Sequence, residues 1–418
     1  MRAAIICLMA AALVSACAPA PADAPGNEEV SASPAEIHER LMVLDSHLDT
    51  PANLSKPDFD IVQDNPSVMG EVQVDLPKML RGGLDGGFWV IFTPQGPLTE
   101  EAFEAAHMAA SARQDEILAM VAGHPEQFEL AYTADDAERI AASGKRVVLQ
   151  SIENSYPLEL DVGNLNEFYD KGVRMVGLIH FRDNQFGGSA TDFTSPDSAG
   201  LTDLGKDLVR EANRLGMVVD GSHASDASVA DMMAISTTPV ILTHTGLKSV
   251  FDHPRNITDD FLKEIAAQGG VIQINAYSAY LEQLEDSPER RAALEVLKAD
   301  FGGIDPFKAD KETQVQFMAR MKVINKEFPP PRSTFEKFME HMLKALELVG
   351  PDHVGMGADW DGGGGVTGME DVSFLHKVTE RLLQEGYTEE DLRKIWGGNL
   401  MRVMRQAEAA REVTASAQ

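Results

Sequence analysis

The sequence predicts a (β/α)8 TIM barrel with a helical insertion between the seventh and eighth strands. Three observations support this prediction: eight short apolar runs, helical patterns between those runs, and a length of 418 residues. Such a barrel needs about 250 residues, so this chain has room for added segments. The alternation of strands and helices also fits a doubly wound open sheet, which the pattern alone does not exclude.

The apolar runs are rich in Val, Ile, Leu and Met on both faces, as is typical of buried parallel strands. The predicted strands span residues 41–49, 86–92, 146–153, 173–180, 216–223, 239–245, 269–276 and 353–359.

Helical patterns separate these runs. Residues 202–216 have apolar positions at helical spacing and end in Gly, and residues 258–270 begin with a Thr cap followed by two acids. Residues 93–145 are expected to form one or two helices. Residues 277–350 form the predicted insertion, which leaves the barrel at the face where catalysis occurs. It is therefore either a lid or pocket wall, or else surface decoration or a dimer contact.

The two ends of the chain are predicted to lie outside the fold, which is expected to cover residues 34–410. Residues 1–16 have one Arg, an apolar run and small residues, as a secretory signal does. The following "VSAC" resembles the lipobox of bacterial lipoproteins, which would make Cys17 the lipidation site; a plain signal peptide with a chance Cys is the alternative. Residues 17–33 are expected to form a flexible linker and residues 411–418 a disordered tail.

These features predict an exported bacterial lipoprotein, anchored on the periplasmic side of the cell envelope. The formal net charge of −30 disfavours nucleic acid or an anionic membrane surface as a partner. The membrane is therefore expected to be contacted only through the lipid on Cys17. A homodimer is the expected assembly.

Potential metal ligands and acid–base residues gather where the predicted strands end. They are His47, Asp49, Glu153, His180, His223, His244 and Asp359. One H-x-D pair such as His47 and Asp49 cannot by itself distinguish a metal site from a polar turn. Such residues stand at the ends of six of the eight predicted strands, on the face of a barrel where catalysis occurs, and together they predict an active site there. The remaining histidines are interpreted as structural or exposed: His38, His107, His124, His253, His341, His353 and His376.

Imidazole and carboxylate groups are the ligands that zinc prefers, with about four around each ion. Five protein ligands are too many for one catalytic zinc that also binds water. They suit two cations about 3.5–4 Å apart that share one carboxylate.

The motifs together resemble the membrane (renal-type) dipeptidase family, a branch of the binuclear amidohydrolase-like barrels. The resemblance covers roughly residues 36–410. It rests on H-x-D at the first strand, a Glu after the third, "SH" at His223, a further His at His244, "RN" at Arg255 and Asn256, "HVGMGADWDG" and "GGNLMRVM".

The resemblance implies a dizinc peptidase that hydrolyses dipeptides, with other divalent ions also possible. His47, Asp49 and Glu153 would bind one Zn²⁺. Glu153, His223 and His244 would bind the other, so that Glu153 bridges the two. A hydroxide between the cations would be the nucleophile.

The resemblance also implies roles for three residues that touch the substrate. His180 would stabilise the oxyanion of the tetrahedral intermediate. Arg255 would hold the free carboxylate of the dipeptide, which explains a preference for dipeptides over longer peptides. Asp359 would move the proton to the leaving amine.

The chain departs from the family pattern in three places. At the bridging Glu the run is "ENSYP", where the family usually has glycines after the Glu, "DSHLDTP" replaces the commoner "DGHND", and the insertion is longer. Asn154, Ser155 and Tyr156 either enter the pocket or simply form the loop. The run "DGGGGV" at 361–366 is interpreted as a flexible loop, since no helical pattern or Lys follows it as in a phosphate-binding loop.

Two other functions remain open on the sequence. One is another binuclear amidohydrolase, such as a cyclic amidase, lactonase or phosphotriesterase, although those enzymes usually have H-x-H and a carboxylated Lys. The other is a tethered solute-binding lipoprotein without catalysis, which would not need five metal ligands.

Overall fold

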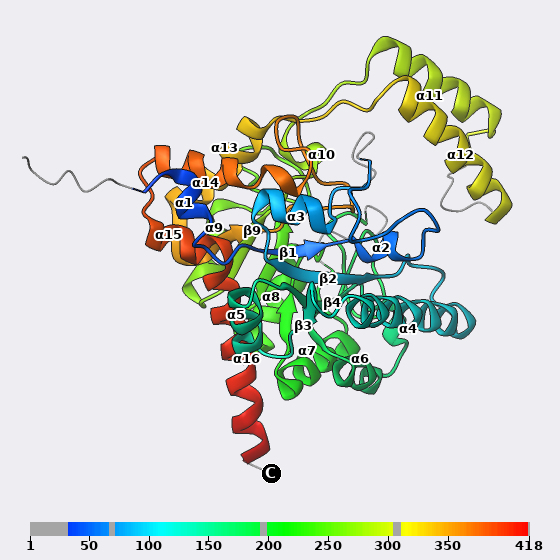
Figure 1. Cartoon of the computed structure of the whole chain (residues 1–418). Coiled ribbons are helices and arrows are strands. Elements are labelled where there is room, and N and C mark those ends of the chain that lie inside the picture. Colours follow the sequence, from blue (N-terminus) through cyan, green and yellow to red (C-terminus); the bar gives the residue numbers. More distant parts are fainter. Residues whose placement is uncertain (1–31, 67–71, 193–198, 304–310, 417–418) are drawn as a thin grey trace, which may run out of the picture. The chain divides into compact units, whose positions relative to one another are not determined.

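Parallel strands form the barrel that the sequence predicts (Figure 1). The computed structural model describes residues 32–66, 72–192, 199–303 and 311–416. The barrel strands, in sheet order, are β1 (Leu44–Leu48), β2 (Gly86–Phe92), β4 (Arg146–Glu153), β5 (Val173–Gly177), β6 (Val218–Asp220), β7 (Ile241–Thr245), β8 (Val271–Ile274) and β9 (Val354–Met356). A parallel bridge between Leu48 and Trp360, four residues beyond β9, brings the end of the sheet back to β1, so the barrel is nearly closed and the open-sheet alternative is wrong.

One strand was not predicted. β3 (Phe128–Leu130) lies between the helices of residues 93–145 and pairs with residues 146–148 of β4, whereas β5 pairs with residues 150–152. β3 has three residues and only Phe128 is buried. A segment this short has no periodic pattern that sequence inspection can detect.

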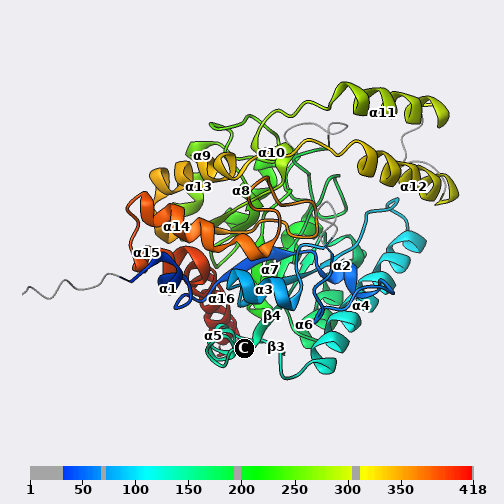
Figure 2. The same ribbon diagram turned by 45° about the horizontal axis from the view of Figure 1, so that its top comes forward.

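Most of the helices surround the strands (Figures 1 and 2). Their bounds are α1 (Pro34–His38), α2 (Pro51–Leu54), α3 (Leu76–Gly82), α4 (Glu100–Gly123), α5 (Ala134–Ala142), α6 (Leu165–Asp170), α7 (Asp203–Leu215), α8 (Asp226–Ile235), α9 (Asp259–Ala267), α10 (Ser278–Leu281), α11 (Pro288–Asp300), α12 (Lys311–Glu327), α13 (Phe335–Val349), α14 (His376–Gln384), α15 (Glu389–Arg393) and α16 (Asn399–Ser416). Short 3-10 turns cover Tyr156–Leu158, Val162–Asn164, Pro351–His353 and Val372–Phe374, and a π-helical turn covers Lys394–Gly398.

The two helices with clear end signals form where the sequence places them. The Thr202 side chain accepts a hydrogen bond from the Gly205 amide at the start of α7, and Gly216 ends that helix in the left-handed conformation. The Thr258 side chain caps α9 by accepting from the Phe261 amide.

The segment between β8 and β9 contains α10, α11, α12 and α13. Helix α13 packs against β8, β9 and α9, as a barrel helix does. Helices α11 and α12 run side by side (Figure 2). Arg290 of α11 donates hydrogen bonds to the Asn325 side chain at 2.9 Å and to the Phe328 carbonyl at 2.7 Å, which fixes one helix against the other.

Helix α16 packs onto the N-terminal ends of the strands. Its Leu400, Met401 and Met404 belong to the same buried cluster as Leu44, Phe88, Val147, Val218, Ile241 and Val271, near the strand starts. The helix continues to Ser416, so residues 411–416 are helical rather than part of the expected tail. The run from Ala407 to Ser416 contains no Gly or Pro to end the helix.

The predicted signal peptide, the lipidation site Cys17 and most of the predicted linker lie outside the described residues. Among the helices that the structure describes, none is long and apolar enough to cross a membrane.

Candidate metal centre and substrate site

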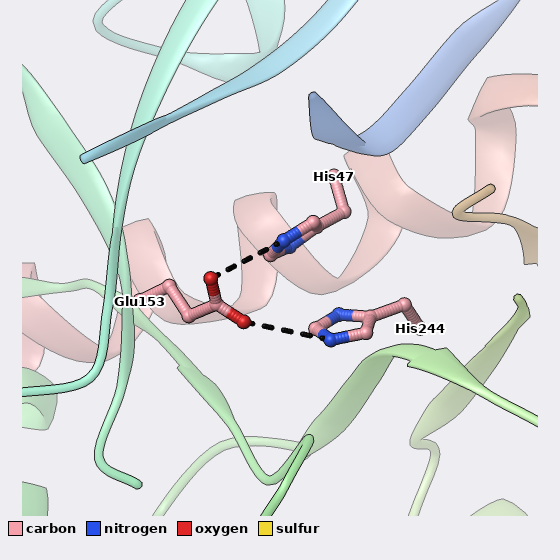
Figure 3. Close-up of side chains that lie close together, drawn as sticks. All are labelled: His47, Glu153 and His244. Carbon is pink, nitrogen blue, oxygen red and sulfur yellow. Dashed lines mark ion pairs between the residues drawn. The ribbon is translucent and has the colours of Figure 1, made fainter. Parts of the chain in front are cut away.

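The other four predicted ligands gather around Glu153 at the C-terminal end of the barrel. Figure 3 shows two of them, His47 and His244, on either side of its carboxylate. Oε1 of Glu153 lies 3.1 Å from Nε2 of His223 and 3.5 Å from Nε2 of His244. Oε2 lies 3.6 Å from Nε2 of His47, which in turn is 3.4 Å from Oδ2 of Asp49. The carboxylate of Glu153 therefore stands between two groups of ligands, as a bridging ligand would.

The barrel brings these side chains together from strands far apart in the sequence. His47 and His244 lie within β1 and β7, Glu153 is the last residue of β4, and Asp49 follows β1 directly. His223 lies three residues beyond β6, because the strand ends at Asp220 and not at residue 223 as expected. His223 has a φ of 66°, a left-handed conformation that costs a non-Gly residue about 1–3 kcal/mol.

A buried hydrogen-bond chain orients His244. The Thr243 hydroxyl donates to Oδ2 of Asp220 at 2.6 Å and lies 2.9 Å from Nδ1 of His244. Since the hydroxyl hydrogen goes to Asp220, Nδ1 of His244 must donate to Thr243. Its Nε2 is then left with a lone pair that faces the site, which is the tautomer that binds a metal.

Asp45 supports the site from below. It is fully buried, and its two carboxylate oxygens accept from the His47 amide at 2.8 Å and the Ala358 amide at 3.1 Å. It therefore links the end of β1 to the segment that follows β9. Asp45, Asp220 and Thr243 were not predicted from the sequence, where the only local signal is a polar residue inside an otherwise apolar strand.

The charges differ on the two sides of Glu153. Burial lowers the pKa of His47, but the charges of Glu153 and Asp49 outweigh burial and raise that pKa well above its ordinary value. Burial lowers the pKa of His244 well below its ordinary value, and His47 lowers it further. The pKa of His223 falls in the same way, through burial and then Arg255. His223 and His244 are thus held in the neutral form that metals bind.

The donor set fits divalent cations. Nε2 of His223 and Nε2 of His244 lie 2.8 Å apart, and Nε2 of His47 is buried without a hydrogen-bond partner within the described part of the chain. Imidazole nitrogens and carboxylates that converge in a buried site and leave such an atom without a hydrogen-bond partner are expected where an ion completes the site.

The three predicted substrate residues lie at the same end of the barrel. Nε2 of His180 is 3.9 Å from Oε1 of Glu153. Arg255 is buried and lines the same pocket as His223. Its Nη2 donates to the His244 carbonyl at 3.1 Å, while its Nε is buried and has no partner among the described residues. A buried guanidinium nitrogen without a partner is a group that a bound anion would satisfy.

Asp359 lies beside His47 and Asp49, close enough to share an ion with them. Burial raises its pKa well above the ordinary value, and the charge of Asp49 raises it further. Its φ of 64° turns the residue into the site three positions after β9 ends. A carboxyl with a raised pKa can both accept and release a proton near neutral pH.

The glycine run at 361–366 packs against these acids, which differs from the expected flexible loop. A Cβ on Gly362 would lie 2.0 Å from Oδ2 of Asp49 and 2.2 Å from Oδ1 of Asp359, so only Gly fits. Asp361 accepts hydrogen bonds from the Thr50 hydroxyl at 2.8 Å and the Gln73 amide at 2.7 Å. The loop is therefore fixed in place.

The residues after Glu153 form the loop and are held by hydrogen bonds to the surrounding backbone. Asn154, Ser155 and Tyr156 are all buried. The Ser155 hydroxyl donates to the Gly177 carbonyl at 3.0 Å, and the Tyr156 hydroxyl donates to the Pro97 carbonyl at 2.7 Å.

None of the metal-ligand groups found among the described residues includes one of the other histidines. His341 illustrates their use: it accepts from the Leu247 amide through Nδ1 at 3.0 Å and meets the Leu281 carbonyl at 3.1 Å. His253 lies nearest to the substrate residues, where its Nδ1 accepts from the Arg255 amide at 3.1 Å.

Comparisons with known proteins agree with the resemblance found in the sequence. The sequence model of the membrane dipeptidase family, peptidase family M19, matches residues 32–418. Dipeptidase tcpJ of Claviceps purpurea is 30% identical over 341 residues, which cover 80% of this chain and 69% of the relative. Dipeptidase ataJ of Aspergillus terreus is 29% identical over 359 residues, which cover 80% of this chain and 77% of the relative.

Solved structures share the fold. The probable dipeptidase PvdM from Pseudomonas aeruginosa aligns with a TM-score of 0.78 at 30% identity, over 90% of this chain and 98% of that one. A metallo peptidase from Rhodobacter sphaeroides, solved with a phosphinate mimic of the dipeptide L-Ala-D-Ala, aligns with a TM-score of 0.69 at 24% identity, over 88% and 99%. At that identity the second match shows the fold alone. With the family model matching from residue 32 to the end, the chain belongs to the membrane dipeptidase family of metallopeptidases, hydrolases that act on peptide bonds.

Proposed function

We propose that this enzyme hydrolyses dipeptides with two divalent cations, zinc being the expected metal, held by His47, Asp49, Glu153, His223 and His244. The observation that carries the proposal is the position of Glu153, whose Oε2 faces His47 while its Oε1 faces His223 and His244. Two cations bound there would supply a water of lowered pKa as the nucleophile.

The chain's own residues account for the remaining steps. Arg255 binds the free carboxylate of the dipeptide through a charge-assisted hydrogen bond, for which its unpaired Nε is available. His180 donates to the carbonyl oxygen as negative charge develops on it. Asp359 accepts a proton at its carboxylate and passes it to the leaving amine, a role for which its raised pKa suits it.

A panel of substrates tests this proposal on zinc-replete protein. We expect dipeptides with a free C-terminal carboxylate to be hydrolysed, and the matching dipeptide amides and tripeptides to be hydrolysed at least about ten-fold more slowly because they lack the contact with Arg255. Equal turnover of the amides would contradict the carboxylate anchor. Faster turnover of a lactone or a cyclic amide than of any dipeptide would favour another binuclear amidohydrolase activity.

The chain's location is a separate proposal. We propose that the protein is exported and anchored by a lipid on Cys17, which is supported by the apolar run before "VSAC". Full-length protein should fractionate with membranes and Cys17→Ser protein should not; if both variants are soluble, residues 1–16 act as a plain signal peptide. We also propose a homodimer, for which light scattering should give twice the chain mass.

A further inference from the structure

We propose that Phe181, together with Phe92, forms an apolar wall of the substrate pocket and makes this enzyme prefer dipeptides with a large apolar side chain. This inference rests on the proposed dipeptide hydrolysis and names the class of dipeptide that the site selects.

Phe181 is an exposed aromatic residue in direct contact with the site. Its side chain is 49% exposed, although its ring centroid lies 4.0 Å from that of His180 and 5.2 Å from that of His223. The ring centroid of Phe92, the last residue of β2, lies 4.7 Å from that of His180. The imidazole of His180 therefore contacts two phenyl rings, one of which offers a free apolar surface.

The backbone of Phe181 is held in place by its own loop. The Thr191 hydroxyl donates to the Phe181 carbonyl at 3.0 Å, and the Ser189 hydroxyl donates to the His180 carbonyl at 2.6 Å. The Ser189 amide donates to Oδ1 of Asp183 at 2.7 Å. A ring on such a fixed loop needs little reordering when a ligand covers it, so the contact is favourable for binding.

A single exposed Phe on a protein surface needs no explanation. Phe181 differs because the groups next to it are the imidazoles of the site. Binding pockets combine a few placed polar groups with apolar walls, and here Arg255 and His180 are the polar groups. A substrate side chain laid on Phe181 would remove apolar surface from water on both partners.

Two series of dipeptides test the wall, Gly-Xaa and Xaa-Gly, where Xaa is Ala, Leu or Phe. In wild-type protein we expect kcat/KM to rise from Ala to Leu and Phe in one of the series. Phe181→Ala should lower kcat/KM for the Leu and Phe members of that series by roughly ten-fold, which is within the range that apolar contacts in a pocket give. The Ala member should change less than about two-fold, and Phe181→Leu should fall between the two proteins.

Tyr132→Ala is the matched control, because Tyr132 is an aromatic residue of similar exposure, 43%, whose ring contacts Arg174 and not the site. It should leave both series unchanged. Bound zinc and thermal unfolding of each variant show whether the site and the fold are intact.

The wall is overturned if wild-type protein shows no preference for Leu or Phe over Ala. It is also overturned if Phe181→Ala lowers kcat/KM equally for all three side chains while zinc content and stability match those of wild type. Failure of wild-type protein to hydrolyse any dipeptide would instead overturn the proposed function.

Discussion

Strand β4 begins with buried Arg146 and ends with buried Glu153, and the two residues have different kinds of partner. At the N-terminal end, Arg146 donates to the Leu84 carbonyl at 2.7 Å and to the Gly144 carbonyl at 3.0 Å, and lies 3.4 Å from Asp85. At the C-terminal end, Glu153 faces four imidazoles. Among the described residues it has no ion pair with the permanently charged side chain of an Arg or Lys.

This difference in partners suggests that the N-terminal end of β4 serves stability and the C-terminal end serves function. The charge of Arg146 is balanced by a carboxylate and by carbonyl groups of the protein itself, so that end can be stable without a ligand. Around Glu153, ligand atoms converge, and Nε2 of His47 has no hydrogen-bond partner among the described residues. The C-terminal end therefore has the groups that a bound metal ion would complete, in agreement with the location of active sites in barrel enzymes.

Removing the bridging carboxylate should have the largest effect. Glu153→Gln should lower kcat by more than about a hundred-fold, because loss of a shared ligand exceeds the roughly 10–100-fold effects of residues that only orient ligands. Zinc per chain, measured by plasma mass spectrometry, should fall as well. Glu129→Gln on β3, where Glu129 pairs with Lys145 at 3.0 Å, is the control and should retain metal and activity.

Asp359→Asn should separate chemistry from metal binding. We expect the variant to keep its zinc and lose roughly 10²–10⁴-fold in kcat, because only proton transfer is removed. Metal analysis and steady-state kinetics on the same preparation decide the matter. Loss of zinc in this variant would mean that Asp359 is a ligand and not a proton carrier.

Arg255→Ala should act on substrate binding. Loss of a charge-assisted hydrogen bond of about 1.5–3 kcal/mol corresponds to a rise in KM of roughly ten-fold or more. The dipeptide amides, which have no carboxylate to bind, serve as the internal control and should change little. An unchanged KM for dipeptides would exclude Arg255 as the anchor.

A substitution at the N-terminal end of the barrel should change the stability of the protein and leave its activity unchanged. Burial raises the pKa of Asp85 to about 6 from its ordinary 3.8, although the Val43 amide and Arg146 favour the charged form. Because the folded state binds this proton more tightly than the unfolded state, the stability from protonated Asp85 is present below pH 3.8 and is lost as pH rises through about 6.

Asp85→Asn removes this dependence. Wild type should lose about 1 kcal/mol of unfolding free energy as pH rises from 5 to 7.5, and the variant should not. Urea denaturation of both proteins at the two pH values measures this difference. Its kcat for dipeptides should stay within about two-fold of wild type, since the residue lies away from the site. A difference in stability that is constant with pH would show that Asp85 does not titrate in this range.

Sequence analysis could predict the barrel and the residues that now surround Glu153, because strand-end positions are visible in the apolar pattern. The helices of residues 202–216 and 258–270 were equally predictable from their caps. β3 was missed because a three-residue strand carries no period. The strand expected at 216–223 ends at Asp220, since a turn with positive φ at His223 is set by the packing around it.

The supporting residues could not be found from local pattern. Asp45 and Ala358 are 313 positions apart, and Thr243 and Asp220 are 23 positions apart. The first hydrogen bond exists only once the barrel closes, and the second only once β6 and β7 pair. The fixed glycine loop was missed for the same reason, since Gly362 is required by the acids that fold against it and not by its neighbours in sequence.

The metal content of the wild-type protein tests the central claim most directly. Protein freed of metal with a chelator, reloaded with zinc and separated from unbound ions should contain two zinc ions per chain, and dipeptide hydrolysis should return as the second ion binds. A folded protein that retains fewer than one zinc per chain, or that hydrolyses dipeptides equally well without metal, would contradict the account.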